Sequence, residues 1–178
     1  MALAKGILST HGGRGTFRSY LFSPSAWFCR VLEINGAGLL TRFLKLMPRR
    51  KLAMYPQVDM QRMPYADDTY DLVVHSDTLE HVPDPGAGLR ECFRVLRPGG
   101  WCCFTVPIIT QRLSRSTNGR PPSYHGQADL IDEGMRVQTE FGSDVWELVL
   151  ATGFDECRIV TVEFPSAQAI VARKPSRK

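Results

Sequence analysis

The hydrophobic positions first form a clear pattern at Arg30–Ile34, a short apolar run rich in β-branched residues. The run stops at the glycine-containing turn Asn35–Gly38. Four apolar residues then recur with the i, i+3, i+4, i+7 spacing of one helix face: Leu40, Phe43, Leu44 and Met47. Pro48 ends this helix. The pattern predicts a buried strand, a tight turn and a helix, which together open an α/β fold.

The rest of the chain alternates between short apolar runs and segments with helical spacing. Strands are predicted at Lys51–Tyr55, Gln57–Gln61, Tyr70–Val74, Trp101–Val106, Cys157–Phe164 and Ala167–Ala172. Helices are predicted between Pro85 and Leu96, with the apolar face Leu89, Cys92, Phe93 and Leu96, and at Ser143–Thr152. This alternation predicts an α/β fold in which helices cover both faces of a mostly parallel sheet.

With 178 residues, the chain is expected to form one domain, at residues 27–174. Residues 1–26 show no clear hydrophobic period and are predicted to be a flexible lead, while 175–178 form a basic tail. Residues 108–140 are polar and rich in Arg, Ser, Gly and Pro. A segment of this length without a regular pattern indicates an insertion into the domain or a disordered stretch.

Composition excludes several classes of protein. Much of the basic excess behind the net charge of +4 sits in Arg112–Arg120 and Arg173–Lys178, a distribution that favours a solvated loop and tail over a nucleic-acid surface. The five cysteines show no CxxC spacing, so neither a disulfide framework nor a metal site is expected. No apolar run reaches the roughly 20 residues of a membrane span, and no secretory signal is apparent. We therefore expect a cytoplasmic protein of unknown oligomeric state.

Three segments carry candidate chemistry. The turn after the first strand, Glu33–Gly38, lets a ligand approach the backbone and leads into a helix N-terminus, although ordinary turns share this pattern. It is not G-x-G-x-x-G, because Thr41 stands three residues after Gly38, which argues against a nicotinamide-dependent oxidoreductase. Asp59, beside Met60, is suited to bind an amine such as that of adenine or simply to cap a turn.

The third segment, His75–Val82, follows the strongest predicted strand and places several ionisable groups at its carboxyl end. His81 is either a general base or a structural histidine that bonds to the backbone. Glu80 and His81 are adjacent and point in different directions, so they do not form a metal pair.

Together, Val31–Gly38, Asp59–Pro64, Tyr70–Val82 and Arg94–Gly100 resemble the class I S-adenosylmethionine-dependent methyltransferases, type 11 subgroup. The resemblance implies a Rossmann-like α/β sandwich with a seven-stranded sheet. The last-placed strand of this sheet is expected to be antiparallel, as part of a C-terminal antiparallel hairpin. It also implies S-adenosylmethionine as the cofactor and a small or medium-sized molecule as the methyl acceptor.

The resemblance also implies which residues hold the cofactor. Glu33 and the turn containing Asn35, Gly36 and Gly38 would line its methionine end. Asp59 and Met60 would flank its adenine. Ser76 and the residues after it would close over it.

Two departures weaken the predicted cofactor site. Met54 stands near the end of the second strand, where the family has an acidic residue that holds the ribose, and no carboxylate lies between Glu33 and Asp59. Residues 51–58 are also too few for both a strand and a helix. The alternative is therefore a non-catalytic relative that serves as a binding or partner subunit.

The insertion contributes one more candidate, since acceptor-binding elements of this family occupy the same place. Tyr124 and His125 are positioned to meet an acceptor, and His125 to take its proton. An incidental histidine on a surface loop is the equally weighted alternative.

Overall fold

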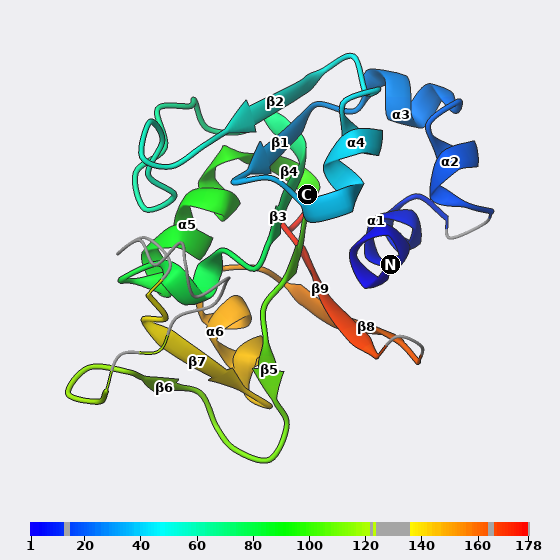
Figure 1. Ribbon diagram of the computed structural model, residues 1–178. Helices are drawn as coiled ribbons and strands as arrows, with labels where there is room; N and C mark the ends of the chain where they lie inside the picture. The colour runs from blue at the N-terminus through cyan, green and yellow to red at the C-terminus, as the bar shows by residue number, and fades with distance from the viewer. Residues whose placement is uncertain (13–14, 122, 124–135, 164–165, 178) are drawn as a thin grey trace.

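The computed structural model describes residues 1–12, 15–121, 123, 136–163 and 166–177 (Figure 1). Within them the main sheet has six strands in the order β2-β1-β3-β4-β9-β8. Their bounds are β1 (Val31–Ile34), β2 (Arg50–Ala53), β3 (Tyr70–Ser76), β4 (Leu96–Thr105), β8 (Glu156–Val162) and β9 (Ala167–Arg173). The first four are parallel, and β9 is antiparallel to both of its neighbours. The predicted α/β class and C-terminal hairpin are confirmed.

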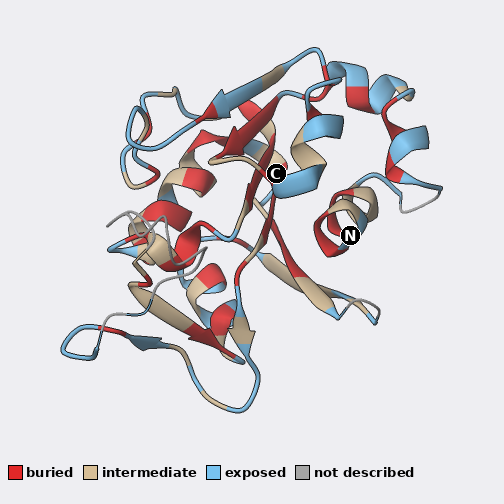
Figure 2. Ribbon diagram, viewed as in Figure 1, coloured by how far each residue is buried: buried red, intermediate tan, exposed pale blue. Residues whose placement is uncertain are grey.

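Helices cover both faces of this sheet (Figure 1). One face carries α5 (Pro85–Val95) and α6 (Val145–Ala151). The other face carries α1 (Ala2–Thr10), α2 (Phe17–Tyr20), α3 (Pro24–Phe28) and α4 (Thr41–Leu44). The strands supply alternate residues to two cores, as in β1, where Leu32 packs with α5 and Val31 with α1. Both cores are red in Figure 2.

The sheet is shorter by one strand than the family resemblance implies. Residues 57–61, predicted as a strand, form turns instead. The Val58 N–H donates to the Met54 carbonyl at 2.9 Å, and the Arg62 N–H to the Asp59 carbonyl at 3.0 Å. These local hydrogen bonds fold the chain back on itself, so no extended run pairs with the edge strand β2.

The N-terminal lead differs from the expected flexible segment. It contains three short helices, and Leu3 and Ile7 of α1 are buried in the core that α1 shares with β9. A side chain at Gly6 would come within 3.0 Å of Val171, so α1 packs close to the sheet. The apolar residues of α1 repeat over only two turns, which is too short a pattern to reveal the helix.

The insertion is also more regular than expected. Its described part forms a small sheet of order β5-β7-β6, made of β5 (Ile108–Ile109), β6 (Arg115–Ser116) and β7 (Thr139–Gly142). Arg112 and Arg115 both pair with Glu140, at 2.6 and 2.7 Å. Side-chain pairing therefore joins segments on either side of residues 124–135.

We predict that Ile7→Ala lowers the free energy of unfolding by about 2–4 kcal/mol, because it leaves a cavity beneath α1. Lys5→Ala, on the exposed side of the same helix, should change it by less than about 0.5 kcal/mol. Urea unfolding measures both values. Equal effects of the two variants would mean that α1 does not pack as described.

Candidate active site

A cleft of about 940 Å³ lies at the carboxyl ends of β1, β3 and β4. Its walls come from the first turn of α1, the Ala37–Leu40 segment, the ends of β3 and β4, and the start of β9. These elements surround the centre of the view in Figure 1. Ligands of open α/β sheets bind at this edge, and the volume is typical of small-molecule sites.

Three polar side chains form a connected cluster in this cleft. Ser76 and Thr105, at the ends of β3 and β4, share a hydrogen bond of 2.8 Å between their hydroxyl oxygens. Ser76 also donates to the Asp77 carboxylate at 3.0 Å. Asp77 has a φ of 47°, a left-handed conformation that non-glycine residues rarely adopt outside functional or strained positions. The cluster therefore holds one carboxylate in a defined place in the cleft.

The remaining walls are largely apolar. The apolar side chains that line the cleft include Leu3, Phe17, Leu39, Leu40, Phe43, Val106 and Ile108. Arg18 is the one basic residue among those that line it, and Asp77 the one acidic residue. The cleft thus combines an apolar surface with a single carboxylate at its floor.

The glycine turn beside the cleft is held by Glu33. This side chain is fully buried, and its Oε1 accepts hydrogen bonds from the Ala37 N–H at 2.9 Å and from the Thr41 hydroxyl. Its Oε2 pairs with Arg50 of the neighbouring strand β2. Asn35, Gly36 and Gly38 of the turn all have left-handed φ values. Glu33 therefore fixes the shape of the turn rather than lining the cleft.

The structure brings only two of the predicted cofactor residues, Gly38 and Ser76, to the cleft. Asn35 instead accepts a hydrogen bond from the Tyr55 N–H at 2.8 Å, which ties the turn to the end of β2. Gly36 lies inside the turn and does not line the cleft. Sequence reasoning missed Asp77 and Thr105, although the expectation that residues after Ser76 close the site pointed towards Asp77.

Asp59 and Met60 lie elsewhere. Met60 is 3% exposed and belongs to the core cluster beneath α5, where it lies beside Gly88. Asp59 is exposed, and its Oδ1 accepts a hydrogen bond from the Gln61 N–H at 2.8 Å. This geometry favours the turn-capping interpretation of Asp59, and neither Asp59 nor Met60 is among the residues that line the cleft beside Gly38.

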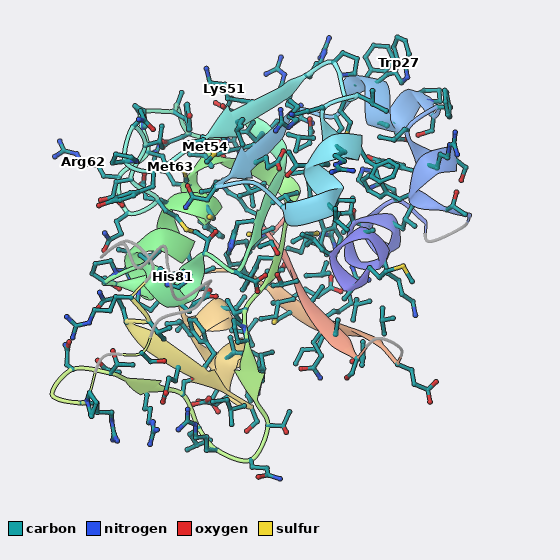
Figure 3. The ribbon with its side chains drawn as sticks, viewed as in Figure 1. Trp27, Lys51, Met54, Arg62, Met63 and His81 are labelled. Atoms are coloured by element: carbon teal, nitrogen blue, oxygen red, sulfur yellow. The ribbon has the colours of Figure 1, made fainter. Side chains whose placement is uncertain are left out.

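His81 closes the short 3₁₀ helix η2 (Leu79–His81) and does not line the cleft. Its Nδ1 lies 3.1 Å from the Arg136 carbonyl, and the Glu80 carbonyl accepts a hydrogen bond of 2.7 Å from the Gln138 N–H. In Figure 3, His81 lies next to the insertion. Its observed contacts anchor the insertion to the domain. His125 and Tyr124 lie outside the described residues, so the proposed role of His125 stays a prediction.

Two other ionisable groups are deeply buried. Burial raises the pKa of Glu80 to about 7, and the nearby Asp77 carboxylate adds to this rise. Burial lowers the pKa of His75 to about 3, so this ring is neutral where it stacks on Phe104 at 4.6 Å.

His75 also lies near two thiols, and the ligand atoms of His75, Cys92 and Cys102 are within 4.8 Å of one another. Metal binding requires thiolates. A hydrogen bond with Cys92, together with burial, raises the pKa of Cys102 well above its usual value. The cluster is part of the core beneath α5, away from the cleft, and its chemistry favours protonated thiols.

The fold is a Rossmann-like α/β fold with a cleft at the carboxyl edge of its sheet. Residues 12–104 match the family model described as "Methyltransferase domain", and because this is more than half of the chain, the protein belongs to that family. The expected class I methyltransferase fold is confirmed.

Curated relatives match over parts of their length. The chain is 35% identical over 114 residues to a ubiquinone/menaquinone biosynthesis C-methyltransferase of Pasteurella multocida, covering 58% of this chain and 41% of the relative. It is 32% identical over 80 residues to a ubiquinone biosynthesis O-methyltransferase of Bordetella pertussis, covering 42% and 33%. The chain thus spans less than half of either relative.

Solved structures share the fold across more of the chain. A SAM-dependent methyltransferase structure from Methanosarcina mazei superposes with a TM-score of 0.50 at 15% identity, covering 83% of each chain.

None of the helices in the described part of the protein has the length and apolar character needed to cross a bilayer.

We predict that Arg50→Met destabilises the protein by about 3 kcal/mol, because it leaves the buried Glu33 carboxylate without its cation. Glu33→Gln combined with Arg50→Met should restore most of this loss. Lys51→Met, at an exposed position on the same strand, is the control. A loss that the double variant does not restore would contradict the ion pair, as measured by urea unfolding.

The raised pKa of Glu80 predicts a specific pH dependence. A group whose pKa is higher in the folded state favours folding below its unfolded pKa, near 4.5, and this contribution is lost as the pH rises through about 7. Glu80→Gln should match the parent at about pH 4 and exceed its stability by up to about 3 kcal/mol at about pH 9. A stability difference that stays constant with pH would contradict this environment for Glu80.

Proposed function

We propose that this protein binds S-adenosylmethionine in the cleft and transfers its methyl group to a small or medium-sized apolar acceptor. The observation that carries this proposal is the cleft itself, in a chain of the methyltransferase domain family. Its volume is sufficient for a cofactor and an acceptor together. The two curated relatives bear names from quinone biosynthesis, and the apolar walls favour an acceptor of similar character.

The cofactor's positively charged sulfonium supplies an already activated methyl group. The protein then has to align the acceptor in line with the methyl group and exclude water. In our proposal, Gly38 and Ser76 bind the methionine end, and the Asp77 carboxylate stabilises the adjacent positive charge. Leu39, Phe43 and their apolar neighbours hold the acceptor. Methyl transfer leaves S-adenosylhomocysteine and a methylated acceptor, with release of a proton from an oxygen or nitrogen nucleophile.

A non-catalytic binding or partner subunit is the second candidate, and two features of the site favour it. Met54 is at the end of β2 (Figure 3), so no carboxylate is present there for the ribose. Glu33 has its carboxylate taken up by Arg50, Thr41 and the turn. Turnover of S-adenosylmethionine with any acceptor would exclude this candidate.

Calorimetric titration of both cofactor forms tests the proposal. Asp77→Asn should weaken S-adenosylmethionine binding by about ten- to a hundredfold, because a charge-assisted interaction is lost. The effect on S-adenosylhomocysteine should be smaller, since its sulfur is uncharged. Asp59→Asn is the matched control, as it removes the carboxylate expected from sequence but outside the cleft. The proposal fails if neither cofactor form binds the parent protein. It also fails if Asp59→Asn weakens binding while Asp77→Asn does not.

A further inference from the structure

The N-terminal third of the chain differs in charge from the rest. Residues 1–58 carry nine Lys and Arg and one acidic residue, Glu33, whereas residues 59–178 carry 13 Lys and Arg and 17 acidic residues. Glu33 is buried and paired with Arg50. The surface formed by the N-terminal third is therefore strongly basic, although the net charge of the whole chain is only +4.

The same region exposes most of the large apolar side chains. Ten of the fifteen exposed large hydrophobic residues in the described part of the chain lie within residues 1–58. Five residues of α3 and its surroundings line one shallow groove, which we term the aromatic patch: Phe22, Pro24, Trp27, Phe28 and Pro48. Phe22, Trp27 and Phe28 are 80, 56 and 66% exposed. Figure 2 shows α3 mainly in the pale blue of exposed residues, with pale blue also on the outer sides of α2 and α4.

Basic residues border the aromatic patch. Arg49 lies over the Phe28 ring at 5.6 Å, and exposed Arg30 lies two residues after the end of α3. Figure 3 shows Trp27 at α3 and Lys51 on β2, farther from the aromatic patch but on the same upper side of the view. The segment before Pro48 adds exposed Leu46 and leads back to Leu39 and Phe43 at the cleft. The aromatic patch and the acceptor side of the cleft are thus joined by one short stretch of chain.

We propose that this surface binds an anionic lipid bilayer, with the aromatic patch inserted among the headgroups and the basic residues on the lipid phosphates. Exposed tryptophan and phenylalanine with surrounding Lys and Arg are typical of surfaces that lie on a membrane. Leu39, Leu46 and Leu52 offer no stacking face to a nucleic-acid base, so a nucleic acid explains less of the surface. Bilayer binding would bring the cleft next to lipid-dissolved acceptors, but it does not depend on cofactor binding.

Flotation with lipid vesicles tests this proposal. The protein should bind phosphatidylcholine vesicles that contain phosphatidylserine, bind pure phosphatidylcholine vesicles weakly, and lose affinity as salt is raised. Trp27→Ser with Phe28→Ser should weaken binding at least about tenfold. Arg49→Gln and Lys51→Gln should each weaken it about fivefold. Trp146→Ser and Arg120→Gln, at exposed positions in the acidic part of the chain, are the matched controls.

A second measurement does not depend on the folding of the serine variants. It is the quenching of tryptophan fluorescence in the parent protein by lipids with brominated acyl chains. Insertion of Trp27 predicts quenching in the parent protein. Trp27→Phe should retain vesicle affinity but lose most of this quenching.

Three results would overturn the proposal. One is equal binding to charged and neutral vesicles, and another is equal losses in the matched controls. The third is tight binding of a single-stranded RNA, or dimerisation through the aromatic patch, without vesicle binding.

Discussion

The geometry of the site depends on the buried carboxylate of Glu33. A buried charge is costly unless donors surround it, and Glu33 receives them from Arg50, from the Thr41 hydroxyl and from the Ala37 N–H. These contacts link β1, β2 and the glycine turn into one unit. This network stabilises the left-handed backbone conformation of the turn. The turn in that conformation places Gly38 in the lining of the cleft. One ion pair between adjacent strands thus sets one wall of the site.

The cleft lies at the carboxyl ends of β1, β3 and β4, which are distant from one another in sequence. β3 and β4 end side by side, so Ser76 and Thr105 meet and hold the Asp77 carboxylate. The opposite wall comes from α1 and from the segment after β1, which are apolar. A charged methyl donor and an apolar acceptor need these two surfaces to face each other. The edge beyond β2 is simplified, because the turns at 54–69 replace the helix and strand that the family resemblance implies there.

Charge is distributed unevenly along the chain, with a basic region at residues 1–58 and a net acidic region at residues 59–178. The helices α2 to α4 and β2 concentrate basic and exposed apolar side chains, while residues 59–178 carry 17 of the 18 acidic residues. The rim of the cleft lies at the boundary between these two regions. The same few elements therefore contribute both to the rim of the cleft and to the exposed basic and apolar surface. α4 connects the cleft to this surface.

Local patterns in the sequence determined the fold class. Apolar runs and helical spacing predicted β1, β3, α5, α6 and the final hairpin, because each buries a continuous apolar surface that its own residues specify. The glycine turn was also visible, since only its residue types suit a left-handed backbone. Tertiary structure alone decided which polar residues meet. It directed Glu33 to Arg50, Met60 to the core and His81 to the insertion, and it assembled Asp77 with Thr105. These outcomes depend on register between strands and on packing across the sheet, which no local pattern contains.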